Sequence, residues 1–279
     1  MSRSLDSSSS RADREQSQVS HKSIGRDRSE DRTQQNKTVY HFNSRNYHLN
    51  AKQETMLRDI GTFRTITTES LQRHVYRNNK DNMEKDLRNL RDLKLVTVQR
   101  ETRGKDHYVS LTKAGKRFSE DQVRTNNGQI LYSGIVKRRE LRHDAAIYEL
   151  YHKESQKISG SGGTVKRVML DFELKKNVNR QLAKIQNLAP AERERQRQQI
   201  AEEHGLKMVK GKIQIPDLRM EYESREQEEC RVDLECVTGH YKSRQIAAKK
   251  AAGFKLYNQD YRGRSAERGE DLIGEVISL

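Results

Sequence analysis

The sequence lacks a long run of apolar residues, and it contains only two cysteines. No stretch is apolar enough to cross a bilayer, and no apolar leader segment follows Met1, so we expect a cytoplasmic protein without membrane contact. Cys230 and Cys236 lie six residues apart in a predicted strand, about 20 Å from each other, which excludes a local disulfide. Because no histidines stand at metal-ligand spacing beside them, the cysteines also argue against a zinc site.

Charge, by contrast, is abundant and unbalanced. Of the 279 residues, 34% are charged, and the formal net charge is +15. A basic excess of this size indicates a polyanionic partner, and nucleic acid is the partner that we expect. The length suffices for a small domain followed by a larger one.

Residues 46–120 have the pattern of a winged helix-turn-helix. Apolar residues recur at helical spacing in 51–63 and 79–93, and a shorter helix with a threonine N-cap is predicted between them. Two β-rich stretches, 95–100 and 107–111, follow on either side of a basic turn. Three helices and a basic hairpin in this order predict a domain that binds double-stranded DNA.

The polar face of the predicted third helix and the tip of the hairpin supply the expected DNA contacts. Asn is suited to adenine edges and Arg to guanine edges, and cations at a wing tip reach phosphate or the minor groove. The alternative is that these charges only solvate a surface helix, whose acidic residues also weaken its positive field. The predicted contacts are Asn78, Lys85, Arg88, Asn89, Arg103 and Lys105.

The rest of the chain divides by composition. Residues 1–45 are polar and charged, and we expect them to be disordered because they have too little apolar surface to offset the entropy of ordering. A connector covers 121–140, an α/β domain covers 141–257, and a tail covers 258–279. The expected fold class is therefore α/β (α+β), with an N-terminal winged helix followed by an α/β domain.

The predicted α/β domain contains a strand and a charged insert before its central hairpin. Apolar residues alternate with Asp171 and Glu173 over 165–174, which predicts a strand with one polar face. Residues 177–205 are highly charged and helical in pattern, and Pro190 divides them into two helices. We expect this insert to project as a helical hairpin.

The most informative chemistry lies in a predicted hairpin within 215–237. One antiparallel register sets Arg219 opposite Asp233, and it pairs charged side chains on one face and apolar side chains on the other. The same register sets Asp217 opposite Glu235, with no cation in the ladder to neutralise them. Either Mg²⁺ held by the two carboxylates, or a neighbouring cation or solvent, offsets their repulsion.

The order strand, Pro216-Asp217, strand, Glu235-x-Val237 and helix resembles the PD-(D/E)xK nuclease core, also known from restriction endonucleases. In that core an Asp and a Glu hold the catalytic metal, and a Lys orients the attacking water. Val237 stands at the position of this lysine, which favours a core that does not cleave DNA. The alternative is that Lys242, at the start of the next helix, substitutes for it.

Four more residues are candidates for the same cleft. Glu149 matches the acid that many of these nucleases carry on their first helix. His143 and Asp144 open that predicted helix, where they either stabilise its N-terminus or line the cleft above the two carboxylates. Glu173 either borders the cleft or belongs to an ordinary polar face of its strand.

Several short motifs follow one another in a recognisable order: Tyr47-x-Leu49, His143-Asp144, Asp171-Phe172-Glu173-Leu174, Pro216-Asp217 and the Glu235 strand. This layout is similar to the replication-relaxation family of bacterial plasmids and mobile elements. The resemblance implies a DNA-binding accessory or regulatory protein of replication, relaxation or transfer, and we expect a homodimer on spaced half-sites. The alternative is a Mg²⁺-dependent DNA endonuclease or nickase targeted by its winged helix. A third hypothesis is a scaffold whose insert recruits a replication or transfer protein.

Overall fold

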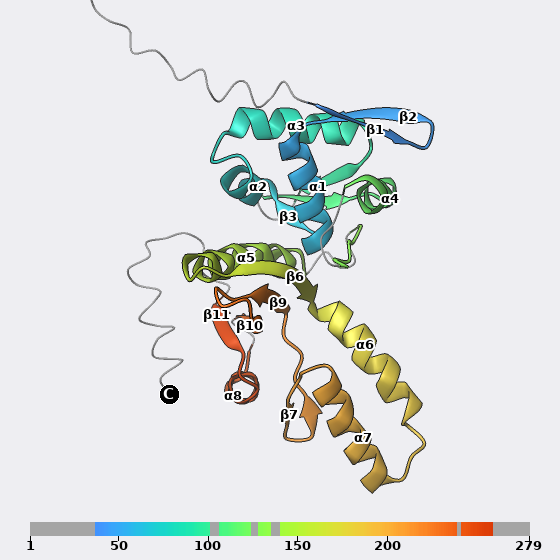
Figure 1. Cartoon of the computed structure of the whole chain (residues 1–279), viewed down its shortest axis with the longest axis vertical. Coiled ribbons are helices and arrows are strands. Elements are labelled where there is room, and N and C mark those ends of the chain that lie inside the picture. Colours follow the sequence, from blue (N-terminus) through green and yellow to red (C-terminus); the bar gives the residue numbers. More distant parts are fainter. Residues whose placement is uncertain (1–36, 101–105, 124–127, 135–139, 239–240, 259–279) are drawn as a thin grey trace, which may run out of the picture. The chain divides into compact units, whose positions relative to one another are not determined.

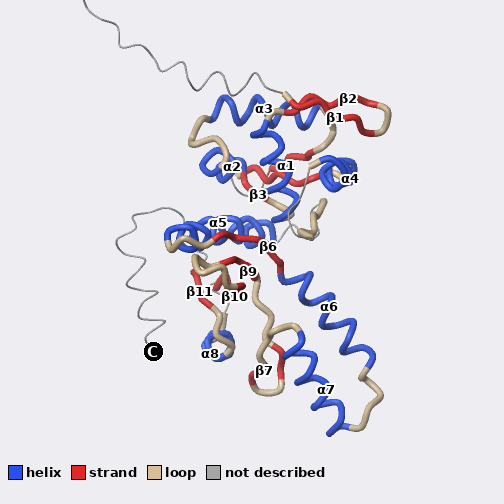
Figure 2. Tube along the Cα trace, in the orientation of Figure 1, coloured by secondary structure: helices blue, strands red, loops and turns tan. Residues whose placement is uncertain are grey.

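Figure 1 shows a computed structural model of the chain, in which residues 37–100, 106–123, 128–134, 140–238 and 241–258 are described. Over these ranges the chain forms eight α-helices and four β-sheets, so the predicted mixed α/β class is confirmed. Figure 2 distinguishes the helices from the strands along the trace. Among the described residues, no helix is long and apolar enough to cross a membrane.

A β-hairpin precedes the first helix, and its first strand lies within the segment that was predicted to be disordered. β1 (Thr38–Phe42) pairs antiparallel with β2 (Arg45–Leu49). The turn residues Asn43 and Ser44 have φ of 47° and 59°, the left-handed conformation that a tight hairpin turn needs. Two aromatic rings of β1 pack edge-on against Phe118. The prediction of disorder is therefore wrong for residues 38–45, and residues 1–36 lie outside the described residues.

The region after this hairpin contains the three predicted helices and the second hairpin. A short strand also pairs with that hairpin, which gives a three-stranded sheet in the order β3-β5-β4. The elements are α1 (Ala51–Phe63), β3 (Ile66–Thr67), α2 (Thr68–His74), α3 (Lys80–Asp92), β4 (Val96–Arg100), β5 (His107–Leu111) and α4 (Lys113–Gln122).

Polar contacts as well as apolar packing fix α3 against α1. Asn50 caps α1, because its side-chain oxygen accepts from the Gln53 backbone at 2.9 Å and the Gln53 side chain accepts in return at 3.0 Å. The amide groups of both residues also donate to the Asp86 carboxylate on α3, and the Tyr76 hydroxyl donates to it at 2.9 Å. We call this arrangement the Asp86 network. It allows a carboxylate to lie between two helices at 8% exposure.

The second large sheet is four-stranded, in the order β11-β10-β9-β6. Its strands are antiparallel except for the outer pair, in which β11 runs parallel to β10 after a helical crossover. The elements of this region are α5 (Leu141–Gly160), β6 (Thr164–Leu170), β9 (Leu218–Glu223), β10 (Glu229–Val237), α8 (Ser243–Ala251) and β11 (Lys255–Asn258).

The pairing of β9 with β10 has the predicted register. Asp233 lies opposite Arg219, and Leu234 lies opposite Leu218. The apolar face of these strands packs against Ile147 and other residues of α5 in the main core. The opposite face carries the charged side chains, so both requirements used for the prediction are met by one alignment.

The insert between β6 and β9 begins earlier than predicted. The strand ends at Leu170, and α6 (Asp171–Lys184) starts at once, so the prediction of a strand up to residue 174 is wrong. The two acids in the first turn favour the helix through its dipole, and Asp171 pairs with Lys175 one turn later at 2.5 Å. After α6, α7 begins at Pro190 as expected.

The insert has a small core of its own. Side chains of α6 and α7 pack together there, and a short hairpin completes the insert before β9. The remaining elements of the insert are α7 (Pro190–Glu203), β7 (Met208–Val209) and β8 (Lys212–Ile213). The two short strands β7 and β8 pair antiparallel and are joined by a turn.

Helix α5 connects the two regions by packing on both. The Tyr148 hydroxyl donates to Asp59 of α1 at 2.7 Å, and the Phe63 ring lies 5.0 Å from the Tyr148 ring. Other residues of the same helix pack against the four-stranded sheet. One continuous buried cluster therefore extends across residue 141, which the sequence had suggested as a domain boundary.

Candidate functional site

The Asp217 and Glu235 carboxylates lie at neighbouring positions beside the four-stranded sheet. The ladder between β9 and β10 ends at Leu218 and Leu234, so the two acids are the next residues beyond it. Oδ2 of Asp217 accepts a hydrogen bond from the Cys236 backbone at 2.9 Å. Asp217 is 9% exposed and Glu235 is fully buried.

Cations from two helices compensate this pair of acids. Lys249 of α8 places Nζ 2.7 Å from Oε1 of Glu235, and His143 of α5 places Nε2 3.3 Å from Oδ2 of Asp217. The Tyr241 hydroxyl donates to Oε1 of Glu235 at 2.8 Å. Among the described residues, the strand ladder contains no cation beside the two acids, but positive charges from outside the sheet neutralise them. We call these five residues the acidic site.

The pKa values of the site follow from burial and from the two acids. Burial and the neighbouring Asp217 charge raise the pKa of Glu235. Burial by itself lowers the pKa of His143, but hydrogen bonds to Asp144 and Asp217 outweigh it and raise the pKa to about 10. His143 is therefore a cation at neutral pH, and its Nε2 lies beside the Asp217 carboxylate.

One oxygen of Glu235 is buried without a partner. Among the described residues, no hydrogen-bond donor reaches Oε2, although Oε1 accepts from both Lys249 and Tyr241. A buried carboxylate oxygen with no partner costs free energy, so such atoms mark strained or ligand-binding positions. This atom is the feature of the site that most directly indicates a bound group.

The donor set fits a magnesium ion better than a transition metal. The described residues contain no group of three or more His, Cys, Asp or Glu side chains arranged to hold a metal. Mg²⁺ is commonly bound by one or two carboxylates with water in the remaining positions, and Asp217 and Glu235 meet that requirement. The unpartnered Oε2 would be the atom available to it.

The lysine that contacts the acidic site is Lys249, not the predicted Lys242. Lys242 caps α8 and is exposed, whereas Lys249 reaches Glu235 and also donates to the Ile215 carbonyl at 2.6 Å. The two lysines are seven residues apart, which is about two helical turns and places them on similar faces. The helical spacing alone was thus a signal for Lys249, and sequence reasoning missed it.

Glu149 does not join the acidic site. It lies six residues after His143 on α5, about 240° around the helix, and it contacts α2 instead. His74 and Arg73 pair with its Oε2 at 2.9 and 3.0 Å. Burial alone would raise the pKa of Glu149, but these partners lower it to about 2. The prediction of Glu149 as a catalytic acid is therefore replaced by a role in joining α5 to α2.

Glu173 is also placed elsewhere, and Asp144 lies at the edge of the site. Glu173 is on α6 rather than on a strand, where it is buried and bonded to Arg167 and to the Tyr132 hydroxyl. Asp144 lies in the first turn of α5 with Oδ1 3.7 Å from Nδ1 of His143. His143 therefore contacts both Asp217 and Asp144, whereas Asp144, among the described residues, forms no hydrogen bond with either of the two acids.

The predicted DNA contacts fall into three groups. Lys85 and Arg88 are exposed on α3, and Asn78 is exposed in the turn before that helix, with φ of 66°. Asn89 is partly buried, and its side-chain oxygen accepts from the Gln53 amide at 3.0 Å. This bond turns the Asn89 oxygen toward α1, so it is a poor candidate for contacting bases. Arg103 and Lys105 lie outside the described residues.

Comparisons of the chain with models of protein families, with curated proteins and with solved structures gave no match. The function is therefore argued from the geometry of the site and from the charge of the surface.

Proposed function

We propose that this protein binds duplex DNA through a winged helix, with α3 as the recognition helix. The proposed role is that of an accessory protein of a plasmid or mobile element, in line with the resemblance to the replication-relaxation family. The order α1, β3, α2, α3 and hairpin β4-β5 supports the winged-helix assignment. The chain's formal net charge of +15 supports a polyanionic partner.

The observation that carries the DNA proposal is the division of α3 into two faces. Leu87, Leu90 and Asp86 are buried against the rest of the domain, while Lys85 and Arg88 are exposed one turn apart. Because the charge of Asp86 is enclosed in the Asp86 network, it does not face a ligand on the outer side of α3. The outer face is accordingly more basic than the sequence of the helix suggests.

Duplex binding can be tested by fluorescence anisotropy with a labelled DNA duplex over a series of salt concentrations. We expect Lys85→Ala and Arg88→Ala each to weaken binding, with a shallower salt dependence when both are changed. Arg180→Ala, an exposed arginine of α6, is the matched control because it removes the same charge from another surface. Equal binding by wild type, the α3 variants and the control would contradict the assignment of α3.

A second function, Mg²⁺-dependent cleavage of DNA, is favoured by the unpartnered Oε2 of Glu235. Asp217 and Glu235 would hold the ion, which supplies Lewis-acid stabilisation and an activated water when bound. His143 holds a positive charge beside Asp217, and Lys249 holds one beside Glu235. Strand, Pro216-Asp217, strand, Glu235 and helix also follow one another as in the PD-(D/E)xK core.

Nicking of supercoiled plasmid with Mg²⁺ or Mn²⁺ tests the second function. We expect Asp217→Ala to abolish nicking and Lys249→Ala to reduce it strongly, since each contributes directly to the acidic site. Arg244→Ala, an exposed position of the same helix as Lys249, is the control. If wild type nicks no substrate with either ion, the enzyme hypothesis is wrong and the DNA-binding proposal stands alone.

A further inference from the structure

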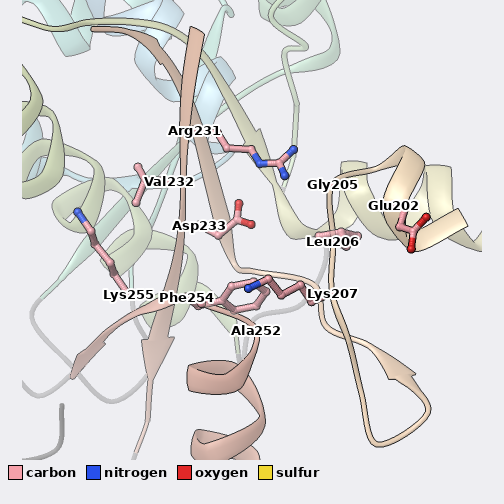
Figure 3. A pocket seen from close by; sticks show the side chains of 11 residues that line it. Glu202, Gly205, Leu206, Lys207, Arg231, Val232, Asp233, Ala252, Phe254 and Lys255 are labelled. Carbon is pink, nitrogen blue, oxygen red and sulfur yellow. The ribbon is translucent and has the colours of Figure 1, made fainter. Parts of the chain in front are cut away.

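A pocket of about 520 Å³ lies on the sheet beside the insert, separate from the acidic site. Figure 3 shows that it is enclosed by β10, by the segment after α7 and by the turn from α8 into β11. Its volume is in the range of small-molecule sites, and it is open to solvent on one side. The residues that line the pocket include Gly205, Leu206, Lys207, Arg231, Asp233 and Phe254.

Two cations of the pocket have no anionic partner. Of the charged residues that line it, Asp233 is bound by Arg219 through two hydrogen bonds of 2.7 and 2.8 Å, Glu202 accepts from Gln198 at 2.7 Å, and Lys255 is bound by Glu154. Within the part of the chain that the structure describes, Arg231 and Lys207 make no ion pair. Both are exposed, so a solvent-borne anion can reach them.

The backbone beside Arg231 leaves room for its guanidinium. Gly205 has φ of +56°, and a Cβ at this position would lie 1.7 Å from Nη1 of Arg231. Any side chain other than hydrogen would therefore displace the guanidinium. The glycine thus leaves room for the guanidinium close to the backbone at the wall of the pocket.

The remaining wall of the pocket is apolar. Phe254 and Leu206 are nearly buried and line the pocket from two different segments. In Figure 3 the Lys207 side chain runs beside the Phe254 ring. A ligand with a phosphate and an adjoining flat or apolar group matches this combination, and a nucleotide has both parts.

The pocket is aligned with the acidic site along one strand. Arg231 and Glu235 are four residues apart on β10, so their side chains leave the same face of the sheet about 13 Å apart. Duplex DNA rises about 3.4 Å per nucleotide, so the separation corresponds to about four nucleotides. A strand that passes Glu235 can thus place one of its phosphates near Arg231.

We propose that this pocket binds the phosphate of a nucleotide through Arg231 and Lys207, with the sugar or base against Phe254. The nucleotide is either free or part of a DNA strand at the acidic site. The assignment to DNA rests on the proposed cleavage function, whereas binding of a free nucleotide does not.

The test is calorimetry of the full chain with deoxyadenosine monophosphate, deoxyadenosine and a 5′-phosphorylated single-stranded oligonucleotide. We expect the monophosphate to bind, and deoxyadenosine to bind at least about tenfold more weakly, because it lacks the charge-assisted hydrogen bonds. Arg231→Gln and Lys207→Gln should each weaken monophosphate binding about tenfold or more. Arg225→Gln, an exposed arginine in the turn between β9 and β10 and outside the pocket, should bind like wild type.

Thermal unfolding of each variant shows whether it is folded. Arg231→Lys keeps the positive charge but removes the planar guanidinium, so it should bind the monophosphate with intermediate affinity. Absence of monophosphate binding at millimolar concentration, or equal binding by Arg231→Gln and wild type, would contradict the proposed phosphate site even if plasmid nicking is observed. Arg231-dependent binding of the oligonucleotide as well as the monophosphate supports a DNA subsite. Arg231-dependent binding of the monophosphate alone supports a free-nucleotide site, even if no nicking is found.

Discussion

Asp86 and Glu235 are both buried carboxylates, but their surroundings differ in kind. The two oxygens of Asp86 accept hydrogen bonds from two amides and a hydroxyl, all uncharged, and both oxygens are used. Glu235 has a lysine and a tyrosine on one oxygen, another acid nearby, and no partner on its second oxygen among the described residues. A fully bonded acid of the first kind fixes helices in place, whereas an acid with a free oxygen is available to a ligand.

The largest expected effect is on stability when Asp86 is removed. Asp86→Ala should lower the free energy of unfolding by about 3 kcal/mol, because two buried amides and the Tyr76 hydroxyl lose their acceptor. Urea denaturation measures this loss. Asp81→Ala, at an exposed position of the same helix, is the control and should change stability by less than about 0.5 kcal/mol. Equal effects of the two substitutions would show that the Asp86 network is not structural.

A smaller effect is expected from titration of His143. Its folded-state pKa of about 10 lies above the ordinary 6.5, so its contribution to stability is complete below pH 6.5 and is lost as the pH rises toward 10. We expect wild type to lose about 2.5 kcal/mol more than His143→Gln between about pH 7 and about pH 9.

Denaturation at the two pH values measures this difference. The cause of the difference can be checked by NMR titration of the His143 imidazole protons in wild type and in Asp217→Asn. The substitution should lower the pKa of His143. Parallel pH profiles of wild type and His143→Gln would contradict the ion pair with Asp217.

The smallest expected effect on stability comes from neutralising Glu235. Burial and Asp217 raise its pKa, so the folded protein disfavours the charged form relative to the unfolded chain. Glu235→Gln should therefore stay within about 1 kcal/mol of wild type by urea denaturation, far from the loss at Asp86. Its binding of Mg²⁺, followed by calorimetry, should nevertheless disappear. A stability loss as large as that of Asp86→Ala would remove the contrast between the two acids.

The β9–β10 hairpin could be predicted because two independent patterns agreed on one register. Shifting it by a single residue would have moved Leu218 and Leu234 to the charged face. The helices α1 and α3 could be predicted equally well, since their apolar residues recur with a helical period and asparagines cap both helices. Where the apolar periodicity and the capping residues agree, the local sequence is enough to predict a helix.

The errors occurred where one local pattern permits two structures or where a partner is distant in sequence. The alternation over 165–174 fits a strand, yet the acids at 171 and 173 also suit the first turn of a helix, and the helix forms. The partners of Glu149 are on α2, about 75 residues earlier, and no local pattern indicates them. Lys242 and Lys249 lie on similar faces of α8, so the local sequence does not indicate which of the two reaches Glu235, and in the structure it is Lys249.

The packing of α5 on both regions has a practical consequence for dividing the protein. Its aromatic residues Tyr148 and Tyr151 contact Phe63 of α1, and other residues of the helix cover the four-stranded sheet. A fragment that begins at Glu140 would expose these rings to water, and a fragment that ends there would uncover Phe63 in turn. Neither fragment would retain an intact apolar surface, so the proposed DNA binding and the proposed cleavage should be tested separately by point substitution rather than by truncation.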